Sequence, residues 1–441
     1  MTSRPLEKAS GSPVALPSET EVLVVGGGFA GLTAARELGR AGVRVVLLEA
    51  RDRLGGRTWT TSVQGSEVEL GGAYVHWYQP HLWSELTRYG LGIQPGREPE
   101  TAAWLSEGRR RDTSAEQLAA LLGEGMAAAC HDAAELMPVP FEIRAEASGA
   151  DRLSVAERLD RTGLRAEVRD LLRGGLGTLS SAPLAEAGYV PTALKAFALA
   201  SSDAGVFLEQ NASHTIRGGT RALVEAMAAD ARADVALSTD VVSVRRSADA
   251  VTLTANGTQM RARAAVMAVP LNALRRIDFD PPLSAAKRRV AWAGQASRGA
   301  KLFLRIRGHH APLMILAPEE HHLTLLEWAG TIEDDTLLVG FASTNRVLSD
   351  RGLLGRAVAD LLPGAEVLDV LAHDWTSDPL AGGTWCTLRP GQFTGALQEL
   401  RRSEGRLVFA GGDIAAGWLG YIDGAIETGL SAARQVRALL S

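Results

Sequence analysis

The sequence predicts a two-domain α/β protein built around a parallel sheet. Three observations support this prediction. The chain has 441 residues, which exceeds the usual size of one domain. It opens with the pattern of a strand, a glycine turn, a helix and a second strand, and strand patterns return in the middle and near the end, after a long helical stretch. The parallel sheet is therefore expected to combine segments that lie far apart in the sequence.

The opening unit can be followed residue by residue. Residues 21–25 form a short apolar run that stops at three glycines, which is typical of a strand. Residues 30–41 place alanines and a leucine on one face at helical spacing, and Gly42 ends that helix. Residues 44–49 form a second apolar strand. A right-handed crossover between the two strands would make them parallel.

The later parts of the chain alternate between helical and strand patterns. From about Ser114 to about Leu208 leucine stripes recur at helical spacing, as in 118, 121 and 122 and again in 171, 172 and 176, and such stripes normally fill a core. The segments with strand patterns are 234–268, 301–307, 337–342 and 406–410. A final helix is expected to begin near Tyr421.

Composition and charge argue against several kinds of partner and location. The formal net charge of −5 disfavours a nucleic-acid partner, because binding to nucleic acid needs clustered positive potential. The densest basic run, Arg109 to Arg111, is expected to be a solvated loop. Two cysteines in unrelated patterns indicate no disulfide framework, which suits a cytoplasmic protein. Residues 1–18 are expected to be a flexible leader, and no apolar run is long enough to cross a membrane.

Two catalytic chemistries lack support in the sequence. The pairs His309-His310 and His321-His322 invite a metal site, but adjacent histidines on a strand point to opposite faces, so no metal is expected. Nucleophilic catalysis by Ser, His and Asp would need an elbow motif that the chain does not contain.

The glycine turn predicts a dinucleotide site. Gly26, Gly28 and Gly31 have the spacing that lets backbone amides approach a pyrophosphate at a helix N-terminus. Glu49 ends the next strand, 18 residues beyond Gly31, where it can accept hydrogen bonds from adenosine ribose hydroxyls. The strand on one side and the helix on the other distinguish this motif from an ordinary tight turn.

Three further motifs resemble those of the flavin-containing amine oxidase family, whose members include monoamine oxidases. Residues 50–57 contain a second Gly-Gly-Arg, in which Arg57 can contact phosphate as a bidentate donor. Residues 69–75 resemble the family segment that lies against the flavin, and residues 409–425 resemble its last flavin-binding motif, with Asp413 suited to a ribityl hydroxyl. The resemblance spans most of the chain and favours FAD over NAD.

The glycine turn and the resemblance together assign a set of FAD contacts. The assigned residues are Gly26, Gly28, Phe29, Ala30, Gly31, Glu49, Ala50, Arg51, Gly56, Arg57, Gly72, Ala73, Tyr74, Val242, Gly412, Asp413, Tyr421, Ile422 and Ala425. The helix from Tyr421 would direct its N-terminus at the flavin, where it stabilises negative charge on the reduced ring.

The resemblance also implies three catalytic residues. Trp385 and Tyr421 match the two walls of an aromatic cage that holds the neutral amine, and Lys301 matches the family lysine that holds a water beside the flavin. Two simpler interpretations stay open. The two rings could be ordinary core aromatics, and the alternation of residues 300–305 could place Lys301 on a solvated face of a strand.

Two departures from the mammalian monoamine oxidases refine this prediction. Those enzymes attach FAD through a cysteine immediately before the first cage aromatic, whereas here Thr384 takes that place and Cys386 follows Trp385, so FAD is expected to be non-covalent. Trp385 also replaces a tyrosine, and together with residues 75–81 it resembles the bacterial nicotine and pseudooxynicotine amine oxidases of the family.

The resulting expectation is a discontinuous, Rossmann-like FAD-binding domain plus an α+β substrate-binding domain with a helical insertion. The first would comprise 19–80, 215–282 and 383–441, and the second 81–214 and 283–382. The expected reaction oxidises a small amine to an imine, with oxygen reoxidising FAD to give hydrogen peroxide. The oligomeric state is left open, with a homodimer as one option.

Other functions remain open at this point. An L-amino-acid oxidase or a desaturase of the same superfamily would share the cofactor motifs, and the former would need a cation such as Arg217 for the substrate carboxylate. A non-catalytic flavin-binding redox sensor is the alternative from another class.

Overall fold

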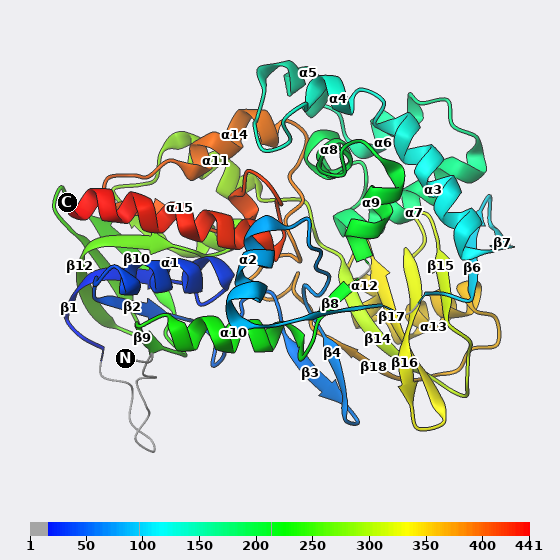
Figure 1. The fold of residues 1–441 in the computed structure, drawn as a ribbon, viewed down its shortest axis with the longest axis horizontal. Helices are drawn as coiled ribbons and strands as arrows, with labels where there is room; N and C mark the ends of the chain where they lie inside the picture. The colour runs from blue at the N-terminus through cyan, green and yellow to red at the C-terminus, as the bar shows by residue number, and fades with distance from the viewer. Residues whose placement is uncertain (1–15, 97, 213) are drawn as a thin grey trace.

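The computed structural model describes residues 16–96, 98–212 and 214–441. The first fifteen residues of the expected leader lie outside this described part. Two large β-sheets organise the molecule, and Figure 1 shows them side by side along its longest axis. The mixed α/β class with a parallel sheet that the sequence predicts is confirmed.

The first sheet joins segments from the beginning, middle and end of the chain. Its strands, in spatial order, are β13 (Asp278–Asp280), β10 (Val241–Arg246), β11 (Val251–Ala255), β12 (Thr258–Met267), β1 (Glu19–Val25), β2 (Val45–Leu48) and β9 (Asp234–Ala236), with β19 (Leu407–Phe409) also on β12. β1 pairs in parallel with β2 on one side and β12 on the other, with Val24 opposite both Leu47 and Val266. Helix α1 (Phe29–Arg40) connects β1 to β2, as predicted.

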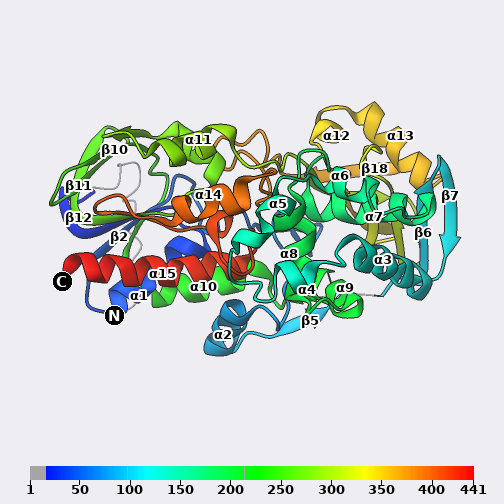
Figure 2. The same ribbon diagram turned by 90° about the horizontal axis from the view of Figure 1, so that it is seen from above.

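Helices cover both faces of this sheet. α15 (Ile422–Leu440) lies along α1, with α10 (Gly219–Asp230) on the other side of α1 (Figure 1). The contact between α1 and α15 is so close that a Cβ on Gly429 would lie 2.5 Å from the carbonyl oxygen of Ala30. On the opposite face lie α11 (Ala285–Ala293) and α14 (Gln392–Arg401), as Figure 2 shows. Because helices cover both faces of the sheet, residues 22–25 of β1 are all apolar and buried, without the alternation of a strand that has one solvated face.

The second sheet is mixed. Its strands, in spatial order, are β18 (Val367–Ala372), β14 (Ala300–Ile306), β17 (Asp335–Ala342), β16 (Leu325–Ile332), β15 (Leu313–Leu316), β6 (Thr101–Ser106) and β7 (Arg109–Thr113). The β15–β6 pair is parallel and the other neighbours are antiparallel. One face packs on α3 (Ala115–Ala129) and α7 (Ala166–Ser180), and the other packs on α12 (Arg346–Ser349) and α13 (Arg351–Leu361).

The stretch predicted to be helical is confirmed. Besides α3 and α7 it contains α4 (Ala133–Leu136), α5 (Ser148–Asp151), α6 (Val155–Asp160), a π-helical turn (Val190–Leu194), α8 (Lys195–Leu199) and α9 (Ala204–Ala212). Leu118 of α3 and Leu171 of α7 are buried against the second sheet, as expected for core leucines. None of the helices in the described ranges is long and apolar enough to cross a membrane.

One local prediction is wrong. Arg109 to Arg111 belong to strand β7 and do not form a loop, because residues 109–113 pair with β6 at the edge of the second sheet. Carboxylates within and beside the strand offset its positive charge: Arg110 pairs with Asp112 of the same strand at 2.8 Å, and Arg111 lies 3.9 Å from Glu167 of α7. Strands with charged side chains are common at sheet edges.

The glycine turn leads to a stability prediction. A Cβ on Gly31 would lie 1.9 Å from the carbonyl oxygen of Gly26, so Gly31→Ala should lower the free energy of unfolding by about 1–3 kcal/mol. Gly355→Ala in α13 is the matched control, because its Cβ would meet no atom within 4 Å and should stabilise the helix by about 0.5–1 kcal/mol. Urea denaturation measures both, and equal effects of the two changes would contradict the packing argument.

Candidate active site

A cavity of ≈ 580 Å³ lies between the two sheets. The carboxyl ends of β1 and β2 open onto it, which is where ligands bind to open parallel sheets. Of the residues expected at the cofactor, the wall contains Gly26, Gly28, Phe29, Ala30, Glu49, Ala50, Arg51, Gly56, Arg57, Gly72, Ala73, Tyr74, Gly412, Tyr421, Ile422 and Ala425. Lys301 and Trp385 line it as well, so the structure brings together segments hundreds of residues apart.

The glycine turn suits an anionic group. Gly26 has φ of 104°, and a Cβ there would lie 2.6 Å from the carbonyl oxygen of Ala268. Helix α1 starts directly after Gly28, has no acidic residue in its first turn and receives no side-chain cap. Its N-terminal amides and the positive end of its dipole therefore face the cavity without a competing carboxylate. A pyrophosphate fits this position.

Glu49 is held at the end of β2 as a buried carboxylate. Its Oε2 accepts a hydrogen bond from the amide of Gly27 at 2.6 Å, and its Oε1 accepts one from the amide of Arg51 at 2.8 Å. Burial raises the pKa of Glu49 above its ordinary value, and the two amides partly offset this. Each carboxylate oxygen can accept a second hydrogen bond, so this group fits a ribose diol.

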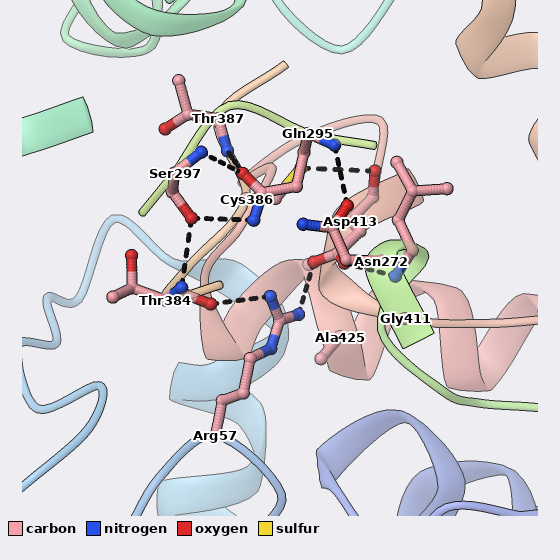
Figure 3. A network of polar contacts seen from close by, with 12 residues as sticks. Arg57, Asn272, Gln295, Ser297, Thr384, Cys386, Thr387, Gly411, Asp413 and Ala425 are labelled. Carbon is pink, nitrogen blue, oxygen red and sulfur yellow. Dashed lines mark hydrogen bonds and ion pairs between the residues drawn. The ribbon is translucent and has the colours of Figure 1, made fainter. Parts of the chain in front are cut away.

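Arg57 connects the first flavin motif to the last one. Its Nη1 donates to the carbonyl oxygen of Thr384 at 2.9 Å, and its Nη2 forms an ion pair with Asp413 (Figure 3). The other oxygen of Asp413 accepts a hydrogen bond from the amide of Leu271 at 2.8 Å. Asp413 therefore braces the loops around the cavity and is not part of its wall.

Two other expected contacts lie outside the cavity wall. Gly31 packs against the backbone of Gly26, as described above. Val242 is 47% exposed, whereas its neighbour Val241 lines the cavity. The register of β10 against β11 shifts between Val241 and Ser243, and this bulge changes which side chains point inward.

A buried polar network holds the segment that carries Trp385 (Figure 3). The Oε1 of Gln295 accepts from the amides of Ser297 at 2.6 Å and Thr387 at 3.1 Å. The Oγ of Ser297 in turn accepts from the amide of Thr384 at 3.1 Å. Asn272 donates to the carbonyl oxygen of Gly382 at 2.6 Å. No local sequence pattern indicates this network, because its members come from separate loops.

Trp385 and Tyr421 lie in the same cavity wall. The indole Nε1 of Trp385 donates to the carbonyl oxygen of Leu179 at 2.7 Å, and its ring meets Phe341 edge-on at 6.2 Å. The ring of Tyr421 meets Trp418 edge-on at 5.2 Å, and burial raises the pKa of its hydroxyl to about 12. Both rings are thus held in the wall by contacts with neighbouring residues and present an apolar surface to the cavity.

Lys301 is a buried lysine in the cavity wall. Its side chain comes from β14, is 4% exposed and donates from Nζ to the carbonyl oxygen of Gly71 at 3.2 Å. The rings of Tyr74, Phe303 and Phe341 surround it at 5.5–5.8 Å from Nζ. Burial lowers the pKa of Lys301 to about 8. The alternative that Lys301 lies on a solvated strand face is therefore wrong, because α3 and α7 cover that face.

Sequence reasoning missed three charged residues of the wall. Two of them, Asp240 and Arg276, form an ion pair at 3.0 Å, and the third is Glu327 on β16. It hydrogen-bonds to the hydroxyl of Tyr74, and burial raises the pKa of its carboxyl to about 7. One sequence signal could have identified Glu327, namely its position as a charged residue within the apolar run Leu325-Leu326-Glu327-Trp328. The individual residues of α3 and α7 that line the wall were not identified either; they are mostly leucines and small residues.

The residues present fit FAD. The glycine turn and Glu49 lie at one end of the elongated wall, and small residues such as Gly72 and Ala73 leave room for a flat ring beside Lys301. The hydroxyl of Thr384 is buried in this wall with no hydrogen-bond partner among the described residues, so it is free for a bound group. In the described part of the chain, no three His, Cys, Asp or Glu side chains are grouped to hold a metal ion.

Comparisons with known proteins agree with this geometry. The family described as flavin containing amine oxidoreductase matches residues 29–437. Pseudooxynicotine dehydrogenase of a Pseudomonas species is 37% identical over 451 residues, covering 100% of this chain and 90% of that protein. (S)-6-hydroxynicotine oxidase of Paenarthrobacter nicotinovorans is 32% identical, covering 92% and 97%. Wild-type putrescine oxidase bound to putrescine shares the fold, with a TM-score of 0.82 at 23% identity, covering 95% and 99%.

The buried lysine leads to a pH-dependent stability prediction. Because the pKa of Lys301 falls from 10.5 to about 8 on folding, the unfolded chain binds more protons between these values, and stability should rise with pH across that window. At pH 7 the folded protein bears the cost of a buried ammonium. Lys301→Met should therefore raise the free energy of unfolding at pH 7 by about 1–3 kcal/mol and lose this advantage toward pH 10.

The matched control is Lys301→Arg, which keeps a permanent charge and should be less stable than the native protein at both pH values. Denaturant titrations at pH 7 and pH 10 provide the measurement. A methionine variant that is less stable than the native protein at pH 7 would contradict the assignment of a costly buried charge.

Proposed function

The chain belongs to the flavin-containing amine oxidoreductase family, and on this premise we propose that it is an FAD-dependent amine oxidase. It would oxidise the carbon next to a substrate amine nitrogen and give an imine. The observation that carries the proposal is one cavity in which a dinucleotide turn, a buried lysine and two fixed aromatic rings share a wall. Binding of FAD would be non-covalent, since Cys386 is absent from that wall and burial raises its pKa well above normal.

Bound FAD would supply the hydride acceptor. The protein would bind the amine between the rings of Trp385 and Tyr421 and exclude water with the leucines of α3 and α7. In such a dry environment the neutral amine is favoured over the ammonium, and its lone pair assists loss of hydride from the neighbouring carbon. The hydrogen bonds from Trp385 to Leu179 and from Thr384 to Ser297 would keep the first ring in place during the reaction.

Lys301 would hold a water molecule beside the flavin. Its ammonium has three donors and gives one to the carbonyl oxygen of Gly71, so donors remain for a water. A positive group at this position also favours the reaction of the reduced cofactor with oxygen, because negative charge develops on oxygen.

Oxygen is the proposed electron acceptor and hydrogen peroxide the proposed product. The relatives differ on this point by name, since one is called a dehydrogenase and another an oxidase. A cytoplasmic location and the option of a homodimer belong to the same proposal. An amino-acid oxidase is less well supported, because Arg217 is exposed and outside the cavity wall, and Glu327 would repel a carboxylate.

We also propose the division into an FAD-binding domain (19–80, 215–282 and 383–441) and a substrate-binding domain (81–214 and 283–382). The composition of the two sheets supports it. Two helices next to the proposed boundaries pack across them. α2 (Pro80–Tyr89) and α11 belong almost entirely to the substrate-binding segments, but they contact α15 and α14 of the FAD-binding segments.

The first test is anaerobic mixing of the FAD-loaded protein with primary amines, secondary nicotine-like amines and amino acids, with the flavin absorbance recorded. Amines should bleach the flavin, and air should restore its colour while peroxide forms. Bleaching that air does not reverse, but that an artificial electron acceptor does, would make the protein a dehydrogenase. A flavin that none of these compounds bleaches would contradict the proposed function and favour a desaturase or a redox sensor.

A second test concerns the two rings. Trp385→Ala and Tyr421→Ala should each slow anaerobic flavin reduction by roughly 10- to 100-fold, because the amine loses its fixed position, while most of the bound FAD is retained. Trp292→Ala is the control, since that ring is 81% exposed and should leave both quantities unchanged. Parallel loss of FAD and of reduction rate would show that the two rings only support the fold.

A further inference from the structure

The sheet face that lines the substrate end of the cavity is apolar except at two positions. Strand register places Lys301 of β14 opposite Phe341 of β17, and Phe341 opposite Leu325 of β16. The next row of side chains contains Phe303, Val339 and Glu327. The backbone positions of Glu327 and Lys301 are therefore two strands apart, which is about 10 Å across the sheet at the usual strand spacing. Glu327 also lies one row of side chains further along the strands.

Glu327 is a half-buried acid of the cavity wall, with one neutral partner and one cationic neighbour. The hydroxyl of Tyr74 hydrogen-bonds to it, and the charge of Lys301 acts on it from across β17. Burial is nevertheless the dominant influence and raises the pKa of the carboxyl to about 7. A carboxylate in such an environment binds a cation strongly, because water does not screen the attraction.

The cofactor does not account for this acid. The residues that fit FAD are the glycine turn, Glu49 and the loops around Arg57, whereas Glu327 shares its strand face with the apolar side chains Met314 and Leu325. Arginines of the wall, such as Arg51 and Arg57, belong to the segments of the cofactor end. The substrate end thus carries an acid that the oxidation of a simple alkyl amine does not require.

We propose that the Glu327 carboxylate, held by Tyr74, binds a second, cationic nitrogen of the substrate, remote from the carbon that is oxidised. This inference rests on the proposed amine oxidation. The preferred substrates are then amines that carry another basic nitrogen on an apolar chain. Lys301 repels the cationic end and Glu327 attracts it, so the substrate enters with its neutral nitrogen toward the aromatic rings and its charged nitrogen toward β16.

The test compares substrates that differ only in the second nitrogen. Linear diamines with four to six carbons are paired with monoamines of equal length, such as 1,4-diaminobutane with 1-aminopentane. For each, anaerobic stopped-flow mixing gives the ratio of the flavin reduction rate constant to the dissociation constant. The native protein should favour the diamine, and Glu327→Gln should lower the diamine-to-monoamine ratio at least roughly tenfold.

Two further variants separate recognition from structure. Tyr74→Phe keeps the carboxylate but removes its hydroxyl partner, so the ratio should fall by less than in Glu327→Gln. Glu333→Gln is the matched control, because Glu333 is an exposed acid in the turn after β16 and the ratio should not change. Flavin content and thermal stability of each variant show whether it is folded.

Each outcome decides the question. A selective loss of the diamine preference supports the inference. Equal losses for diamine and monoamine in Glu327→Gln would overturn it and make Glu327 a proton acceptor or a structural acid. An unchanged ratio in Glu327→Gln would overturn it as well. A flavin that no amine reduces in the native protein would overturn the proposed function itself and the inference with it.

Discussion

The parallel pairing of β1 with β2 and β12 is the constraint on which the rest of the molecule depends. It brings the ends of three strands to one edge of the first sheet, and the loops that follow them carry the glycine turn, Glu49 and the segment after Met267. β19 joins the same sheet in parallel and delivers Gly412 and Tyr421 to that edge. Buried on both faces, these strands have no freedom to slip, because a shift by one residue would reverse every side chain.

The second sheet supplies the opposite wall of the cavity, and this wall contains charged groups that lower the stability of the fold. Lys301 and Glu327 are charged groups on a face that α3 and α7 cover with apolar side chains. Burial brings their pKa values to about 8 and about 7, so both groups can change protonation near neutral pH. Two apolar residues would make a more stable wall. We therefore infer that these charges are present for their interactions with bound molecules.

Much of this architecture could be predicted from the sequence because it follows from patterns within short segments of the chain. The β1–α1–β2 unit, the helical stretch and the strands β14, β17 and β19 each follow from apolar periodicity and glycine positions. Features that depend on how a strand pairs with its neighbour could not be predicted from the periodicity of a single segment. Arg109 to Arg111 form a strand only because β6 lies beside them, and Val242 points outward because of a bulge against β11.

The candidate site shows the same division. Sequence motifs pointed to most of the expected cofactor residues that line the cavity, whereas the network of Asn272, Gln295 and Ser297 and the acid Glu327 became visible only in three dimensions. Lys301 was ambiguous in the sequence, since strand alternation shows which residues share a face and not what covers that face.

The central claim is that the amine and the flavin ring share the cavity between the two sheets. A crystal structure of the FAD-loaded protein with tert-butylamine tests it most directly, because this amine has no C–H next to its nitrogen and cannot be oxidised. The account predicts the flavin ring beside Gly72, Ala73 and Lys301, with the amine nitrogen between Trp385 and Tyr421. An amine bound elsewhere, or a flavin ring outside this cavity, would contradict it.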